Sequence, residues 1–125
     1  MQPVNLFHLA SQQAEWLSAR QATVAGNIAN ANTPGYRAVD VEPFEKVLER
    51  TGVSLTATQD GHFGARVSEV NYRSRDDDRT TAILPSENTV VMEQELMKAG
   101  EVGRSFEMNT AIVKAFHRMM LMSVR

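Results

Sequence analysis

The sequence predicts a mainly α-helical, elongated protein. Long N- and C-terminal helices pair as a coiled-coil-like hairpin beside a small, partly irregular, β-containing central segment. Apolar residues recur at spacings of three, four and seven over residues 5–28 and again over 87–125, which is the period of a helix face. The stretch between them carries turn signals and short alternating runs, which are typical of strands and loops. The chain therefore divides into an N-terminal helix and turn (1–36), a central segment (37–86) and a C-terminal helix (87–125).

The length of the second helix determines the overall shape. About 34 helical residues extend for roughly 50 Å, whereas a compact chain of this size has a radius of gyration near 14 Å. So small a protein cannot wrap such a helix, so we expect the two terminal helices to pair. The pair would leave much apolar surface uncovered, and assembly with other subunits is the expected way to bury it.

The N-terminal helix is unusual in its polar side. Residues 1–36 contain only two charges, Glu15 and Arg20, and the remaining polar positions are mostly amides, with alanine between them. A solvated helix usually carries charged residues on its outer face. We therefore expect this helix to be packed nearly all round, by its own chain or by neighbouring copies. The apolar residues expected to pack are Leu6, Leu9, Trp16, Leu17, Val24 and Ile28.

The first helix is followed by a set of helix breakers. Thr33 precedes a proline and is pushed out of the helical region. Pro34 and Gly35 suit the second and third positions of a type II turn, in which glycine supplies the positive φ. Asn30 or Asn32 is expected in a left-handed cap. This pattern indicates a rigid corner of the backbone and contains no catalytic signature.

The central segment mixes short elements. A helix is expected with Pro43 at its first position and Gly52 at its end. Alternation over 53–57 and the run 66–72 suggest two strands around the turn signal at 60–61. The charged run 73–79 is expected to be a solvated loop.

The C-terminal helix is expected to start at a side-chain cap from Asn88 or Thr89. Gly100 and Gly103 indicate either a close helix–helix approach or a local weakness. The methionines near the end fit an adaptable binding surface or ordinary packing. One apolar stripe is predicted along the helix, made of Met92, Leu96, Ala99, Val102, Phe106, Val113, Phe116 and Met120.

Composition excludes several functions. Thirteen basic and fifteen acidic residues leave a net charge of −2, which is not the clustered basic surface of a nucleic-acid-binding protein. Cysteine is absent, so disulfides, thiolate metal sites and cysteine nucleophiles are excluded. No apolar run is long enough to span a membrane. The first residues lack the basic start of a cleaved signal peptide, so we expect a cytoplasmic location or export by another route.

No catalytic or metal-binding arrangement stands out. His8, His62 and His117 lie in three different segments, and none has a ligand at helical spacing. Gly-rich phosphate loops and nucleophile elbows are also missing. We therefore predict no catalytic residue, no metal, no cofactor and no enzymatic activity.

Two stretches closely resemble the bacterial flagellar rod and hook protein family. Residues 27–36, Asn-Ile-Ala-Asn-Ala-Asn-Thr-Pro-Gly-Tyr, resemble the Ala-Asn-x-x-Thr-Pro-Gly-Tyr signature of that family, and residues 88–97 resemble the start of its last helix. The short length, residues 37–40 and residues 58–63 are most similar to the proximal rod proteins. Pro43 before Phe44, and phenylalanine at 106 where tyrosine is common, are departures. The signature positions are Asn27, Ala29, Asn30, Thr33, Pro34, Gly35 and Tyr36.

The resemblance implies a structural subunit of the flagellar basal-body rod, which assembles helically for motility. Its implied partners are copies of itself, other rod subunits, the basal-body ring/rod junction protein and the flagellar type III export gate. Its implied location is the rod crossing the periplasm, reached without signal cleavage. The N-terminal apolar residues named above are expected to pair with Leu96, Phe106, Val113, Phe116 and Met120.

Two points stay open at this level. Phe44 and Leu48 resemble the element that docks rod subunits on the export gate, and they equally fit the core face of a short helix. The main alternative function is a cytoplasmic coiled-coil adaptor or export chaperone that binds one partner through its methionine-rich helix. A third hypothesis is a small enzyme whose active site is assembled from residues distant in the sequence.

Overall fold

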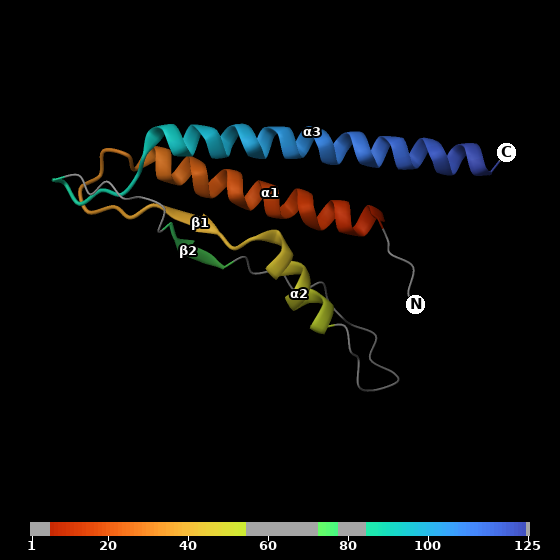
Figure 1. Cartoon of the computed structure of the whole chain (residues 1–125), viewed down its shortest axis with the longest axis horizontal. Coiled ribbons are helices and arrows are strands. Elements are labelled where there is room, and N and C mark those ends of the chain that lie inside the picture. Colours follow the sequence, from red (N-terminus) through yellow and green to blue (C-terminus); the bar gives the residue numbers. More distant parts are fainter. Residues whose placement is uncertain (1–5, 55–72, 78–84, 125) are drawn as a thin grey trace.

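The computed structural model describes residues 6–54, 73–77 and 85–124, and Figure 1 shows that they form an elongated hairpin of two helices with smaller elements along one side. The elements follow in the order α1 (Leu6–Ala29), β1 (Val39–Val41), α2 (Phe44–Ser54), β2 (Ser74–Asp76) and α3 (Met92–Ser123). Helices α1 and α3 lie side by side and antiparallel, and α3 extends well past the start of α1 (Figure 1). The predicted fold class is confirmed.

The hairpin is held by a narrow apolar seam. Leu17, Val24 and Val102 are almost fully buried between α1 and α3, as expected where the apolar faces of two helices pack together. Towards the free end, the rings of Phe7 and Phe116 meet edge to face with centroids 5.3 Å apart. Burial of a large aliphatic side chain contributes about 1.5–3 kcal/mol, so these few contacts account for much of the pairing.

One face of α1 is not covered by the part of the chain that the structure describes. This outer face exposes Ser11, Glu15, Ser18, Ala22, Ala25 and Ala29. Their alternating spacings of four and three place them on one side of the helix. The small, mostly uncharged character of this face was the reason to expect all-round packing. Among the described residues nothing covers it, so the face is a candidate surface for contact with a neighbouring copy.

Helix α2 packs against α1 through aromatic side chains. The ring centroids of Trp16 and Phe44 are 5.7 Å apart, and Trp16 Nε1 donates a hydrogen bond of 2.8 Å to the carbonyl of Glu42. The helix begins at Phe44, one residue after the expected Pro43, and it continues past Gly52 to Ser54. The strand predicted from position 53 is therefore wrong at its start. A glycine inside a helix costs only about 1 kcal/mol, too little to end this one.

The sheet has two short antiparallel strands. β1 pairs with β2 in a register that places Asp40 opposite Arg75, and Glu42 N and Asp77 N donate to Arg73 O and Ala38 O, each at 3.0 Å. The prediction of a solvated loop over 73–79 is thus wrong for Ser74–Asp76. All three β2 side chains are exposed. Pairing with β1 therefore satisfies backbone hydrogen bonds of β2 while its charged side chains stay in water. The strands expected at 55–57 and 66–72, the turn at 60–61, His62 and residues 78–79 lie outside the described residues.

The helix ends differ from the expected caps. Helix α3 begins after Val91 without a side-chain cap, so the predicted capping by Asn88 or Thr89 is wrong. The left-handed asparagine cap is also wrong, because Glu87 is the only described residue besides glycine with a positive φ. Asn30 caps α1 differently: its Nδ2 donates a 2.8 Å hydrogen bond to the carbonyl of Gly26.

The buried line of α3 is rotated relative to the predicted stripe. Glu95, Lys98, Val102 and Asn109 are its buried residues, whereas Leu96 is 59% exposed. The rotation of the buried line has a physical cause. Charged groups of opposite sign satisfy one another on the inner side, and the long apolar side chains are left outside. Among the described residues, no helix is long and apolar enough to cross a membrane.

Candidate assembly site

The signature turn is a tight corner of the main chain. Tyr36 N donates to Thr33 O at 3.2 Å, which closes a four-residue turn around Pro34 and Gly35. Gly35 has a φ of +74°, which glycine adopts without steric cost. The predicted turn and its positive φ are confirmed, while Ala29, Thr33 and Pro34 point into solvent.

Asn88 holds this corner from the segment before α3. Its Nδ2 donates to the carbonyls of Asn30, Ala31 and Thr33 at 2.9, 2.9 and 2.8 Å. Its Oδ1 accepts from Val90 N at 2.8 Å, and the residue is 1% exposed. The chain that follows α1 turns away from helical geometry, and one side-chain amide contacts three of its carbonyls around the corner. Asn88 thereby ties the start of the C-terminal segment to the signature turn.

Thr89 adds a second tie beside Asn88. Its Oγ1 accepts from Ala38 N at 2.8 Å, and its N–H donates to Tyr36 O at 3.1 Å. These bonds fix the strand that leaves the turn against the segment that leads into α3. The two residues predicted as caps therefore connect distant parts of the chain.

Asn27 connects the turn to both helices and the sheet. It is fully buried, and its Nδ2 donates to Val39 O at 2.7 Å and to Glu95 Oε2 at 3.1 Å. Its Oδ1 accepts from Val39 N at 3.1 Å and from the hydroxyl of Tyr36 at 3.3 Å. All of its hydrogen-bonding capacity is used. One side chain therefore links α1, β1, α3 and the signature turn.

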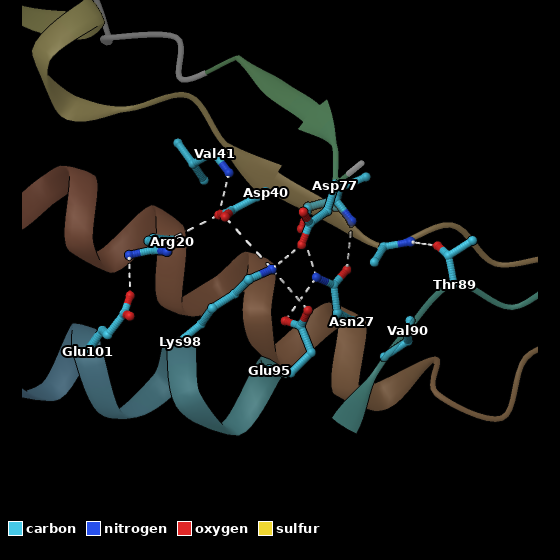
Figure 2. A network of polar contacts seen from close by, with 12 residues as sticks. Arg20, Asn27, Asp40, Val41, Asp77, Thr89, Val90, Glu95, Lys98 and Glu101 are labelled. Carbon is cyan, nitrogen blue, oxygen red and sulfur yellow. Dashed lines mark hydrogen bonds and ion pairs between the residues drawn. The ribbon is translucent and has the colours of Figure 1, made fainter. Parts of the chain in front are cut away.

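A buried ionic group lies next to Asn27, and we call Asn27, Asp40, Asp77, Glu95 and Lys98 the polar cluster. Figure 2 shows its members converging from α1, from β1, from the end of β2 and from α3. The ammonium of Lys98 contacts Glu95 Oε1 at 3.1 Å and Asp40 Oδ2 at 3.8 Å, and it bonds directly to the carboxylate of Asp77. The cluster thus forms only where the sheet and the helix pair meet.

The charges of the cluster change the acidity of Lys98. Burial alone would lower the pKa of its ammonium, but hydrogen bonds to Asp77 and Glu95, and the charges of Glu95 and Asp40, outweigh burial and raise the pKa above its ordinary value. A buried charge is tolerated only when paired and hydrogen-bonded. Lys98 is therefore the cation that keeps three inward-facing carboxylates stable.

Arg20 extends this contact towards the surface. Its Nε lies 3.4 Å from Asp40 Oδ1, and its Nη1 lies 3.5 Å from Glu101 Oε2. The guanidinium also lies over the Trp16 ring, 5.6 Å from the centroid. Such partly exposed pairs contribute at most about 1 kcal/mol. Arg20 therefore orients Asp40 and contributes little by itself to stability.

The chemistry of the site is that of a structural joint. No group of His, Asp or Glu side chains in the described ranges has an arrangement suited to a metal ion. Sequence reasoning found Asn27 and Tyr36 through the signature but missed Asp40, Asp77 and Lys98. A detectable signal was present: Glu95 and Lys98 are three positions apart and precede Val102 at helical spacing, so charged side chains fall on the same line as a buried apolar one.

The residues expected to form the helix pair differ in their burial and in their contacts. Leu17 and Val24 are buried, and Phe106 lines a groove on the open side of the hairpin with Val24 and Ile28. Trp16 contacts Phe44 instead of α3. Leu6, Leu9, Val113 and Phe116 are half-buried, as are Phe44 and Leu48, whereas Leu96 and Met120 are exposed.

Helix α3 also exposes an apolar face that we call the methionine face. Its residues, Met97, Met108, Ile112, Met119 and Met122, follow one another at spacings of eleven, four, seven and three positions. All of these spacings are close to whole turns of a helix. Exposed fractions on it reach 70%. Clusters of exposed large apolar side chains are typical of protein–protein contacts.

The backbone of the signature turn gives a direct prediction. A Cβ at Gly35 would meet no atom within 4 Å, and the same holds at Gly103 in α3. Gly35→Ala is expected to destabilise the chain by about 1–2 kcal/mol, because an L-residue there must adopt the left-handed region. Gly103→Ala is expected to stabilise it by up to about 1 kcal/mol. Urea unfolding followed by circular dichroism measures both, and equal shifts of the same sign would contradict the backbone explanation.

Comparison with known proteins agrees with these features. The family model described as "Flagella basal body rod protein" matches residues 16–37, which cover the end of α1, Asn27 and the turn. The chain is 46% identical over 129 residues to the flagellar basal body rod protein FlgB of Agrobacterium fabrum, covering all of this chain and 96% of that protein. It is 32% identical over 103 residues to FlgB of Escherichia coli K12, covering 72% and 71% of the two chains. It is 31% identical over 107 residues to FlgB of Salmonella typhimurium, covering 75% and 74%.

Proposed function

Because the chain belongs to the FlgB family of flagellar basal body rod proteins, we propose that it assembles helically with copies of itself and with other rod subunits through its paired terminal helices. Membership of this family makes it a structural component of the basal body and not an enzyme. We also propose that the assembled rod passes through the periplasm, that the chain contacts the ring/rod junction protein, and that the type III gate exports it without signal cleavage.

One observation carries this proposal: within the described residues, the hairpin leaves an apolar face of α3 and a small-residue face of α1 open. Met97, Met108 and Met122 are 68%, 65% and 70% exposed on α3, and α1 presents its small outer face. A subunit inside a packed tube needs such surfaces, whereas a free protein would lose solubility through them. The polar cluster also supports the proposal, because it holds the two helices of each hairpin in a fixed arrangement that can be stacked.

Mass spectrometry of detergent-extracted basal bodies tests the proposal. Detection of this chain in the purified basal bodies, beginning at Met1 or Gln2, is the expected result. Detection only in the soluble cytoplasmic fraction of flagellated cells would contradict it and would favour an adaptor or export chaperone.

We also propose that Phe44 and Leu48 contact the export gate before folding is complete. Both are half-buried in the folded chain, where Phe44 packs on Trp16, so undocking of α2 from α1 would expose the Phe44 ring fully. Phe44→Ala is expected to leave the chain inside the cell. The matched control is Trp16→Ala, which loses the same ring contact from the other side and is expected to be exported. Equal export of the two variants would show that Phe44 acts only in packing.

A further inference from the structure

The two open helix faces of this chain differ in a way that suits them to each other. The outer face of α1 consists of small side chains and carries one charge, Glu15. The methionine face of α3 consists of long, flexible side chains. Flexible methionines fill irregular space well, and small residues let a second helix approach closely. Neither face is covered within the described chain.

The charges on the two faces are also complementary. Two charged residues lie along the methionine face, Glu101 and Arg104, and Arg20 of the same chain already contacts Glu101. Arg104 and Glu15 are both exposed, and neither has an ion-pair partner among the described residues. Among the described residues, the outer face of α1 therefore offers the negative charge of Glu15, and the methionine face offers the positive charge of Arg104.

We propose that the methionine face of one copy docks on the outer face of α1 in the next copy, with Arg104 opposite Glu15. The inference rests on the proposed function, because it assigns the contact between neighbouring copies in the rod. The two faces are different surfaces of one chain, so the contact is heterologous: each copy keeps one free face, and the assembly extends without closing on itself. A rod needs this kind of contact, and a closed dimer does not.

The charge pair fixes the register. Neighbours in a helical stack that lie along the same axis keep their directions, so α3 of one copy runs antiparallel to α1 of the next, as the two helices do within the chain (Figure 1). Two turns from the charge pair, Ala22 lies opposite Met97, and one turn the other way, Ser11 lies opposite Met108. Met97 and Met108 thus meet the small side chains of Ala22 and Ser11 on either side of the charge pair.

The absence of cysteine allows a clean cross-linking test of this register. The full chain carrying Ala22→Cys and Met97→Cys replaces the native one in flagellated cells, and purified basal bodies are oxidised and separated by mass without reductant. We expect linked species of two and more copies. The matched control combines Ala22→Cys with Ala115→Cys, which is exposed on the same side of α3 but about 27 Å further along. The control is expected to stay unlinked.

Three results would overturn the inference. They are linkage in both variants, linkage in neither, or linkage of Ala22→Cys to a chain of different mass, each with the chain present in the basal bodies. Absence of the chain from the basal bodies would instead refute the proposed function, so the two failures are distinguishable.

Charge reversal gives an independent readout of the same contact. Glu15→Arg and Arg104→Glu are each expected to cause loss of swimming, because each places like charges opposite one another. The double reversal is expected to restore swimming. Normal swimming in both single variants, or no rescue in the double variant while all three chains are made and exported, would contradict the pairing.

Discussion

Replacement of Lys98 by methionine is expected to lower the free energy of unfolding by about 3–5 kcal/mol, because removal of one partner leaves uncompensated charge in the interior. The side chain is 7% exposed and contacts Asp40, Asp77 and Glu95. Without its ammonium, the three carboxylates lose the cation that they share, and Arg20 contacts only Asp40 among them. Urea unfolding of the purified chain, followed by helix circular dichroism at neutral pH, measures the loss.

The matched control for this variant is Lys114→Met on the same helix. Lys114 is exposed, and substitutions at such sites usually change stability by no more than about 0.5 kcal/mol. A double variant, Lys98→Met with Glu95→Gln, is expected to recover part of the loss, because one of the carboxylates is neutralised and the two sites are in contact. Equal stabilities of the two single methionine variants would show that the cluster contributes little.

The same lysine predicts a pH dependence with a definite sign. Its pKa in the folded chain lies above the ordinary value of 10.5, so folding favours the protonated form. The resulting stabilisation is complete below about pH 10.5 and is lost as the pH rises through the higher folded value. The stability difference between the natural chain and Lys98→Met is therefore expected to be constant around neutral pH and to shrink in strong alkali. A difference that shrinks below pH 9 would contradict this assignment.

Asn27→Ala is the second variant with a large expected effect. The substitution removes two donated and two accepted hydrogen bonds from a fully buried position. Each buried polar group left without a partner costs about 1–3 kcal/mol, so we expect the loss to match or exceed that of Lys98→Met. Urea unfolding again measures it.

Asn32→Ala is the control for the loss of an asparagine near the turn. Asn32 is exposed, so its removal is expected to leave stability nearly unchanged. Asn27→Asp is a sharper probe, because it keeps the shape and the acceptor for Val39 N but loses the donors to Val39 O and Glu95. It also adds a negative charge next to Glu95, so we expect a loss similar to that of Asn27→Ala. A stable Asn27→Asp chain would contradict the hydrogen-bond account.

The sequence predicted the helical elements well because their signal is local. The apolar period over 5–28 anticipates α1 (Leu6–Ala29) almost to the residue, and Pro34 with Gly35 specifies the turn through backbone sterics alone. The strands were missed for the opposite reason. β1 and β2 have three residues each and pair across a gap of more than thirty positions, and short charged segments of this kind carry no periodic signal.

The site was only half predictable, for a related reason. The signature contained Asn27 and Tyr36, but whether a charge is buried depends on partners that arrive from elsewhere in the chain. Glu95 lies in the first turn of α3, and in the structure it is 1% exposed between Asn27 and Lys98. Mutual pairing of charges therefore decided which face of α3 turns inward, against the apolar stripe.

The most direct test of the whole account is cryo-electron microscopy of isolated basal bodies. We expect this chain to lie in the rod as a two-helix hairpin, with Lys98 in contact with Asp77 and Glu95. We also expect the methionine face of each copy to lie against α1 of a neighbouring copy. A rod in which the chain is present but α1 and α3 are separated, with Lys98 in solvent, would contradict the claim that the polar cluster makes each subunit a fixed unit for stacking.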